Sequence, residues 1–364
     1  MLIKILKRKS IVTKVALLTI WREKNYGAEL QAYATVRALK EIGVDVEMID
    51  LRLSDNVKLS LKGKIAHAIA KYSKENRKFE KFWKIYIPTG RHYHSFYELR
   101  KHPPIADIYL VGSDQVWNPE ITKGYAPAYF LDFGSENIKR VSYASSFGSF
   151  VWKGDMELSN IAAKRLRQFA KISCREATGI KILKSFFGIS AQNVLDPIFL
   201  HKSYPELTGE IIQNDTLVYY PLSRFDEVGE ICETLAEELD LKFVNANDKK
   251  FIFGKVVWDR PSIQQWLKSI AEASLVVTSS FHGLVLSILY KRQFIILQNS
   301  NYERSSRLTD LLEMLNLNDR YFTSVDDFYK AKPWKKRIDY AAVEAKLNIY
   351  ATVSWSFFYD ILKQ

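Results

Sequence analysis

The chain has 364 residues, of which 47% are hydrophobic and 26% charged, a composition typical of a globular protein and not of a disordered one. This length is sufficient for two domains, because single hydrophobic cores rarely grow beyond about 250–300 residues. The two cysteines, Cys174 and Cys232, form no CxxC motif, which argues against a disulfide framework or a zinc site and fits a reducing cytoplasm.

The formal net charge of +12 predicts anionic partners: nucleic acid, anionic lipid headgroups or phosphorylated substrates. No zinc finger or RNA-recognition signature is present, so we expect no nucleic-acid partner. No apolar run approaches the length of a membrane span. The start, Met1 to Lys9, is too short and too basic for a secretory signal, so the sequence predicts a cytoplasmic location.

The first half of the chain alternates predicted strands and helices. Lys14–Ile20 is an apolar strand, Ala28–Ile42 an amphipathic helix that Gly43 ends, and Val44–Asp50 the next strand. This order predicts a parallel sheet with a right-handed crossover. The loop Asn25-Tyr26-Gly27 at the first strand exit lacks the GxGxxG pattern, so we expect no dinucleotide.

The segment from Lys58 to Tyr86 has a different pattern. Its apolar residues recur at helical spacing, and lysines and Arg77 cover the other face. One interpretation is a helix packed on the domain with a solvated basic face. The other is a basic amphipathic surface that rests on an anionic membrane.

Three further strands of the first half are followed by polar residues. Ile105–Val111 precedes Asp114, Arg140–Ser145 precedes Ser146, and Lys171–Cys174 precedes Arg175. Open parallel sheets bind ligands at the carboxyl ends of their strands. Asp114 is therefore a base, a ligand of a hydroxyl group or a turn residue, and Arg175 is a ligand contact or a member of a surface ion pair.

The second half repeats the alternation. The predicted strands are Thr216–Tyr220, Lys242–Ala246, Leu275–Thr278 and Phe294–Leu297, and the predicted helices are Glu227–Leu239, Ile263–Ala273, Leu284–Leu289 and Glu303–Leu315. We therefore predict an α/β fold of two Rossmann-like domains that face a central cleft, residues 1–205 on the acceptor side and 206–338 opposite. Residues 339–364 form a closing helical segment.

The junction between strand 275–278 and helix 284–289 combines features of an anion site. A strand that turns directly into a helix leaves backbone N–H groups aimed at one spot. Ser279 or Ser280 can cap the helix, Gly283 lets a ligand approach the backbone, and His282 can exchange a proton near neutral pH. The alternative is a structural histidine that closes a turn. The helix terminus favours neutral imidazole, and a bound phosphate would restore the proton.

Five motifs in order resemble the polysaccharide pyruvyl transferase family from about residue 14 to residue 316. They are Asn25-Tyr-Gly-Ala-Glu-Leu-Gln-Ala-Tyr33, Val111-Gly-Ser-Asp-Gln-Val-Trp-Asn-Pro119, Ser173-Cys-Arg-Glu176, Leu195-Asp-Pro197 and Thr278-Ser-Ser-Phe-His-Gly283. The resemblance implies a GT-B-like fold, phosphoenolpyruvate as donor, and as acceptor a sugar of a cell-surface glycan or its lipid-linked precursor.

The resemblance also implies roles for residues. It makes His282 the general acid and Arg175 a ligand of phosphoenolpyruvate, and Asp114 fits the base or acceptor for the sugar hydroxyl. Many relatives have a second arginine where this chain has Ser280, and Arg304 or Arg307 is the candidate replacement. Ser279, Ser280 and Gly283 complete the predicted donor site. The predicted acceptor site consists of Asn25, Tyr26, Gln31, Gln115, Trp117 and Asn118.

The predicted function is therefore ketal formation between pyruvate and two sugar hydroxyls in bacterial surface-polysaccharide biosynthesis. No metal or cofactor is expected beside the phosphoenolpyruvate donor. The basic charge suits an acceptor on polyprenyl diphosphate at the inner face of the plasma membrane. Two alternatives remain: a nucleotide-sugar glycosyltransferase of GT-B type, and a non-catalytic glycan-binding family member, which Ser280 keeps open.

Overall fold

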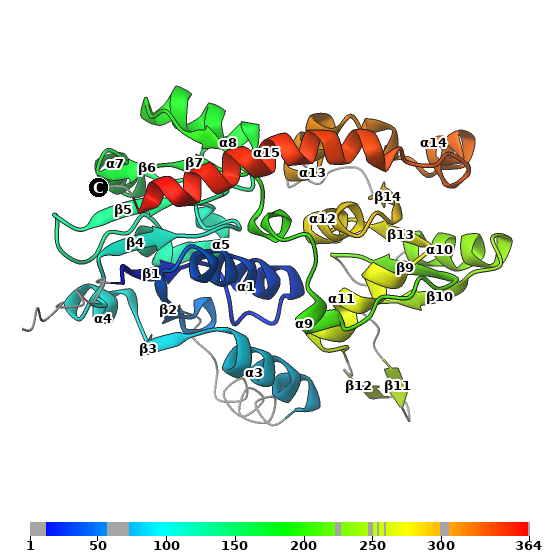
Figure 1. The fold of residues 1–364 in the computed structure, drawn as a ribbon, viewed down its shortest axis with the longest axis horizontal. Helices are drawn as coiled ribbons and strands as arrows, with labels where there is room; N and C mark the ends of the chain where they lie inside the picture. Colours follow the sequence, from blue (N-terminus) through cyan, green and yellow to red (C-terminus); the bar gives the residue numbers. More distant parts are fainter. Residues whose placement is uncertain are drawn as a thin grey trace, which may run out of the picture.

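The computed structural model describes residues 12–56, 73–222, 227–246, 250–252, 255–257, 260–298 and 306–362. Each half of the chain forms its own parallel sheet covered by helices, which confirms the predicted α/β fold of two Rossmann-like domains (Figure 1). The predicted helical residues 58–72, the basic start and Arg304 lie outside the described residues.

The N-terminal sheet is parallel with strand order β3-β2-β1-β4-β5-β6. Its strands are β1 (Lys14–Leu18), β2 (Asp45–Leu51), β3 (Thr89–Tyr93), β4 (Ile108–Val111), β5 (Lys139–Ser142) and β6 (Phe169–Lys171). The central strand β1 pairs Val15 with Val46 on one side and with Ile108 on the other. Because both faces of β1 are covered, its apolar run is continuous and not alternating. A separate parallel pair joins β7 (Ser173–Cys174) to β8 (Gln192–Asn193).

Helices cover this sheet and connect its strands. They are α1 (Tyr26–Glu41), α3 (Lys74–Tyr86), α4 (Phe96–Lys101), α5 (Pro119–Thr122), α6 (Ala126–Tyr129), α7 (Met156–Leu166), α8 (Ala177–Ile182) and α9 (Pro205–Thr208), with the short turns η1 (Leu53–Asn56) and η4 (Pro197–Leu200). Helix α1 begins before the predicted Ala28, because the Asn25 side chain accepts the N–H groups of Gly27 and Ala28. The loop expected at this strand exit is therefore partly a helix N-terminus.

The C-terminal sheet is also parallel, with order β10-β9-β13-β14-β15. Its strands are β9 (Thr216–Tyr220), β10 (Lys242–Asn245), β13 (Leu275–Thr278), β14 (Gln293–Leu297) and β15 (Tyr321–Phe322), and β11 (Lys250–Ile252) pairs with β12 (Lys255–Val257) outside it. Its helices are α10 (Glu227–Glu238), α11 (Ile263–Glu272), α12 (Phe281–Leu289), α13 (Ser306–Leu315) and α14 (Val325–Ala331). Helix α12 begins at Phe281 and not at the predicted Leu284, so His282 belongs to its first turn.

The aromatic face of α3 is internal. Phe79 stacks on Tyr26 with ring centroids 5.5 Å apart, and Trp83 Nε1 donates to the buried Glu29 carboxylate at 2.6 Å. For residues 74–86 the packed-helix interpretation therefore holds, and this apolar face does not meet lipid. Within the described ranges, no helix is both long and apolar enough to cross a membrane.

The last helix, α15 (Tyr340–Ile361), runs across both domains (Figure 1). At its start the Tyr340 hydroxyl donates to the Ser287 carbonyl of α12. Further along, Ser354 Oγ accepts the Leu195 N–H, and Asp360 pairs with Lys171 at 2.6 Å. The helix predicted for residues 339–364 thus contacts both domains.

Candidate active site

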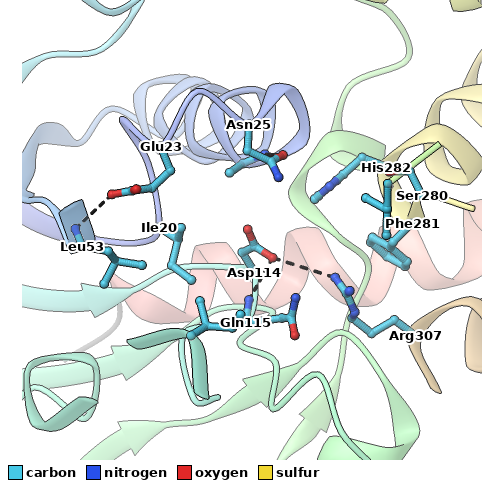
Figure 2. A pocket seen from close by; sticks show the side chains of 13 residues that line it. Ile20, Glu23, Asn25, Leu53, Asp114, Gln115, Ser280, Phe281, His282 and Arg307 are labelled. Carbon is cyan, nitrogen blue, oxygen red and sulfur yellow. Dashed lines mark hydrogen bonds and ion pairs between the residues drawn. The ribbon is translucent and has the colours of Figure 1, made fainter. Parts of the chain in front are cut away.

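A polar pocket of about 280 Å³ lies between the two domains at the strand exits (Figure 2). The N-terminal domain contributes Ile20, Glu23, Asn25, Ala28, Leu53, Asp114, Gln115 and Ile121, and the C-terminal domain contributes Leu222, Ser280, Phe281, His282 and Arg307. The pocket therefore occupies the cleft that the sequence predicted. Its ionisable groups lie on both walls, Glu23 and Asp114 on the N-terminal side and His282 and Arg307 on the C-terminal side.

The start of α12 forms one wall of the pocket. Ser280 is the N-cap, and its Oγ accepts the Gly283 N–H at 3.4 Å. Ser279 instead accepts the Leu222 N–H at 3.1 Å, which ties the junction to the end of β9. A Cβ at Gly283 would lie 2.4 Å from Thr278 Oγ1, so glycine at this position lets the helix and the strand pack closely, and the approach of a ligand to its backbone stays a prediction.

His282 is buried at the pocket wall. Its Nε2 lies 3.8 Å from Asp196 Oδ2 and has no hydrogen-bond partner among the described residues. Burial lowers the pKa of His282 to about 4, although Asp196 and Asp114 oppose the shift. The imidazole is therefore neutral at pH 7 in the free protein. An anion in the pocket would favour its protonated form.

Gly27, in the first turn of α1, packs directly on this imidazole. A Cβ at position 27 would lie 2.0 Å from His282 Nδ1 and 2.3 Å from its Cγ. A glycine is required here because the N-terminal domain approaches the histidine of the other domain closely. The α1 terminus also brings a second helix dipole to the pocket, which favours anions.

We expect Gly27→Ala to displace the imidazole and lower turnover at least about tenfold, since a misplacement near 1 Å can cost about a hundredfold. Overpacking should also lower the free energy of unfolding by about 1–3 kcal/mol. Steady-state kinetics and urea unfolding measure both effects. The double variant Gly27→Ala/His282→Ala is the control: it should lose no more activity than His282→Ala alone. An additional loss would show that Gly27 acts through other residues.

A buried cluster of charges lies beside His282. Arg175 is almost fully enclosed, and its guanidinium contacts Asp196 at 2.8 Å, Asp114 at 3.3 Å and Glu176 at 3.5 Å. It also lies 4.4 Å from the centroid of the Phe281 ring. Arg175 is not part of the pocket lining, and its contact with the donor stays a prediction. In this structure it holds the pocket residue Asp114 in place.

Asp114 follows β4 with a positive φ of 74°, an uncommon conformation that aspartate tolerates better than most residues. Its Oδ1 accepts the Gln115 N–H at 2.9 Å and lies 3.9 Å from Arg307 Nη1. Burial acts to raise the pKa of Asp114, but Arg175, His282 and Arg307 together with the Gln115 N–H hold it below its usual value. Asp114 is thus an ionised carboxylate, suited to accept a hydrogen bond.

The predicted donor and acceptor residues divide into two groups. Asn25, Gln115, Ser280 and Arg307 line the pocket. Tyr26, Gln31, Trp117 and Asn118 are buried outside its lining. Tyr26 stacks between Phe79 and Trp266, and the Trp117 indole donates to the Tyr129 carbonyl at 3.0 Å. These motif residues hold the domain interface and the strand exits together.

Sequence reasoning missed two acidic residues of the site. Glu23 lines the pocket, accepts the Leu53 N–H at 2.9 Å, and has a pKa that burial raises. Asp196, in the Leu195-Asp-Pro197 motif, accepts from Arg175 and from Ser113 Oγ at 3.1 Å. The position of Asp196 after β8 offered a signal, since it also follows a strand. Glu23, in a polar loop, offered none.

Two facing Rossmann-like domains with a polar pocket at their strand exits define a GT-B-like protein. The fold is shared with a UDP-GlcNAc 2-epimerase of Methanocaldococcus jannaschii, at 13% identity and a TM-score of 0.50 over 90% of this chain and 93% of that one. It is also shared with MnaA of S. aureus, solved with UDP, at 10% identity and a TM-score of 0.51 over 92% and 91%.

The chain belongs to the polysaccharide pyruvyl transferase family, whose model matches residues 25–301. This finding confirms the resemblance carried by the five motifs, and it supports a transferase that acts on a sugar or polysaccharide. No curated protein sequence matches the chain.

Proposed function

We propose that this protein transfers pyruvate from phosphoenolpyruvate to two hydroxyls of a sugar, forming a ketal on a bacterial surface polysaccharide or its polyprenyl-diphosphate-linked precursor. The observation that carries the proposal is the meeting of His282, Arg307 and Asp114 at one pocket between the domains. The family supports a sugar acceptor. The net charge of +12 supports anionic substrates.

The donor end of the pocket is proposed to lie at α12. Arg307 is the lining arginine, and the first N–H groups of α12 add an anion-binding helix terminus. Arg307 thus compensates for the serine at position 280. Phosphate binding next to His282 favours the imidazolium. That proton then passes from the ring to the methylene carbon of enolpyruvate, which makes the adjacent carbon electrophilic.

The remaining steps need no further proton donor from the protein. One sugar hydroxyl attacks the electrophilic carbon and loses its proton to a carboxylate. Phosphate then leaves from the same carbon with the electron pair of the C–O bond, and the second hydroxyl attacks that carbon to close the cyclic ketal, passing its proton to the departing phosphate. Two carboxylates line the pocket on the side of the N-terminal domain: Asp114 at the centre of the pocket and Glu23 beside Leu53 (Figure 2).

The two carboxylates differ in basicity. Asp114 has a lowered pKa, whereas burial raises the pKa of Glu23, which makes Glu23 the stronger base of the two. We assign proton removal to Glu23 and orientation of the hydroxyl to Asp114. Of the roles predicted for Asp114, this assignment selects the ligand of a hydroxyl group.

We expect Glu23→Gln to lower kcat by about a hundredfold or more with little change in KM, because general base catalysis is worth about 10²–10⁴-fold. In Asp114→Asn, KM for the acceptor should rise as well. Initial rates across acceptor concentrations separate the two effects. Near-normal kcat for Glu23→Gln together with a collapse in Asp114→Asn would return the base to Asp114.

The experiment that tests the function is phosphate release from phosphoenolpyruvate in the presence of lipid-linked galactosyl, glucosyl and N-acetylmannosaminyl acceptors. Acceptor-dependent release with a pyruvyl mass gain on the glycan would establish the activity. Protection of the protein against unfolding by UDP or GDP, without protection by phosphoenolpyruvate, would favour a nucleotide-sugar glycosyltransferase. Glycan binding without turnover of any acceptor would favour a non-catalytic family member.

A further inference from the structure

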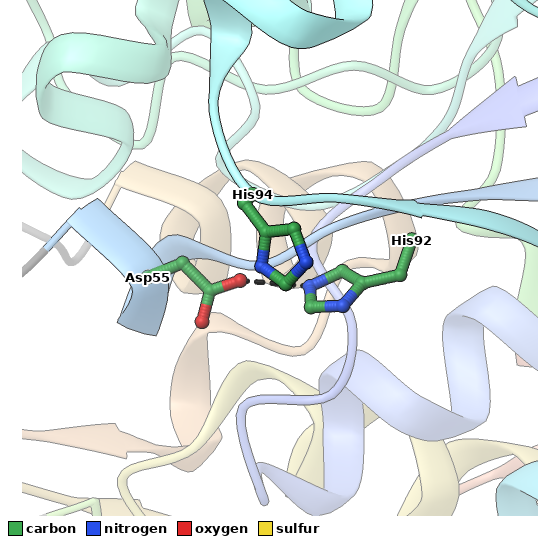
Figure 3. Close-up of side chains that lie close together, drawn as sticks. All are labelled: Asp55, His92 and His94. Carbon is green, nitrogen blue, oxygen red and sulfur yellow. Dashed lines mark hydrogen bonds and ion pairs between the residues drawn. The ribbon is translucent and has the colours of Figure 1, made fainter.

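A second cluster of functional side chains lies on the N-terminal domain, outside the pocket lining. Asp55, His92 and His94 each offer one ligand atom, and these atoms lie within 4.8 Å of one another (Figure 3). His92 Nε2 is 2.8 Å from Asp55 Oδ2, and the two imidazole centroids are 4.3 Å apart. Two of the six histidines in the chain thus converge on one carboxylate.

The fold positions these groups at the carboxyl end of the N-terminal sheet. His92 and His94 are two residues apart at the end of β3, and such a spacing places side chains on the same face of a strand. Asp55 lies in the turn η1, which follows β2, the parallel neighbour of β3. Asp55 precedes the two histidines by 37 and 39 positions in sequence, and the pairing of β2 with β3 brings the three residues together.

The backbone at these positions is held by the surrounding residues. The Glu98 carboxylate accepts the His94 N–H at 2.9 Å, and the Tyr125 hydroxyl donates to the His94 carbonyl at 3.1 Å. Glu23 accepts the Leu53 N–H in the turn that carries Asp55. These contacts fix the backbone that carries His94 beside the His92–Asp55 pair.

We propose that Asp55, His92 and His94 bind a divalent transition-metal ion of the zinc class. Two imidazoles and one carboxylate suit zinc and its first-row neighbours, whereas magnesium and calcium prefer oxygen ligands alone. Ligand bonds of about 2.0–2.2 Å place the donor atoms roughly 3–3.5 Å apart, so small side-chain rotations close the site. Asp55 and His94 are exposed, which gives an ion access and leaves coordination positions open to water.

The nearby charges do not oppose this site strongly. Asp50, the partner of His92 in the sheet, is already engaged by Arg22 at 2.7 Å and by Arg52 at 2.8 Å. It therefore serves as counter-ion to both guanidinium groups and not as a metal ligand. Bound metal would join η1 to β3, and because Leu53 of η1 lines the pocket, the ion would stabilise this side of the pocket. The proposal stands independently of the transferase chemistry.

The test is calorimetric titration of the tag-free, EDTA-treated protein with Zn²⁺, supported by the visible absorption of bound Co²⁺. We expect one ion per chain in the wild type and at least about a tenfold loss of affinity in His94→Ala, because even residues that only support ligands contribute about 10–100-fold. His94→Ala leaves the His92–Asp55 ion pair intact. His102→Ala removes an exposed histidine outside the cluster and should bind as the wild type does.

A second readout is thermal stability. Zn²⁺ should raise the Tm of the wild type and of His102→Ala, since a ligand that binds the folded state stabilises it by mass action. It should not raise the Tm of His94→Ala. The proposal is overturned if no binding occurs up to about 1 mM Zn²⁺ (above the range that structural sites require). The proposal is also overturned if His94→Ala binds Zn²⁺ as tightly as the wild type, or if His94→Ala and His102→Ala lose affinity equally. Either result would indicate that Zn²⁺ binds to separate surface histidines.

Discussion

Replacing His282 by asparagine is expected to lower kcat by about 10²–10⁴-fold, the usual contribution of a positioned acid. Asparagine retains a polar side chain of similar reach but cannot donate a proton to carbon. Phosphoenolpyruvate should still bind, because Arg307 and the α12 terminus are unchanged. Phosphate release and equilibrium binding, measured side by side, separate the loss of chemistry from the loss of donor affinity.

His201→Asn is the matched control for this prediction. His201 is also a buried histidine, its Nε2 lies 3.1 Å from the Ala34 carbonyl, and it does not line the pocket. The control should lower stability without a comparable loss of turnover. If His282→Asn retains wild-type turnover, His282 is structural and the acid lies elsewhere.

His282 also makes the protein sensitive to acid. Its folded pKa of about 4 lies below the ordinary value of 6.5, so between these pH values the unfolded chain binds a proton that the folded chain does not. The stability of the wild type should therefore fall, by at most about 3 kcal/mol from this group, as pH drops through that window. Urea unfolding should show a weaker pH dependence for His282→Asn, because asparagine does not titrate.

The sequence predicted the central elements well because apolar runs and capping residues act locally. Strands β9 and β13 and the start of β1 match their predicted bounds, since buried parallel strands are short continuous apolar runs. The edge strand β3 was missed because its polar residues, Thr89 to Tyr93, carry no such run. The approach of His92 to Asp55 was therefore also not predicted, because it results from the pairing of β2 with β3.

The candidate site shows the same division. His282 and Asp114 were predicted because polar residues directly after a buried strand must lie at the sheet edge. Local pattern gave no signal for the enclosure of Arg175 by three carboxylates or for the contact of Gly27 with His282, because both depend on how separate segments pack. The aromatic motif residues Tyr26 and Trp117, predicted as acceptor contacts, are buried in the core, which their local pattern did not indicate.

Removing the charge of Arg175 should be the most destabilising change in the site. In Arg175→Met the carboxylates of Asp114, Glu176 and Asp196 would share a buried region without their common cation. Breaking a buried ion pair on one side costs about 3–5 kcal/mol. Turnover should be lost together with stability, because Asp114 would lose one of the cations that position it in the pocket.

The pH dependence distinguishes this mechanism from simple loss of packing. Without Arg175, burial raises the pKa values of Asp114 and Glu176 above their unfolded values, so the folded variant gains protons in acid and loses stability as pH rises through the raised values. The loss of unfolding free energy relative to wild type should therefore be largest near pH 7.5 and smaller near pH 5 in urea unfolding.

Arg165→Met is the matched control, since this buried arginine pairs at 2.7 Å with Asp132 and at 2.9 Å with Glu136 away from the pocket lining. The Glu136 carboxylate is 57% exposed, so water can solvate it after the change, and both the pH effect and the loss of turnover should be small. Equal deficits at both pH values in Arg175→Met would show that its guanidinium acts through packing and not as the cation of the cluster.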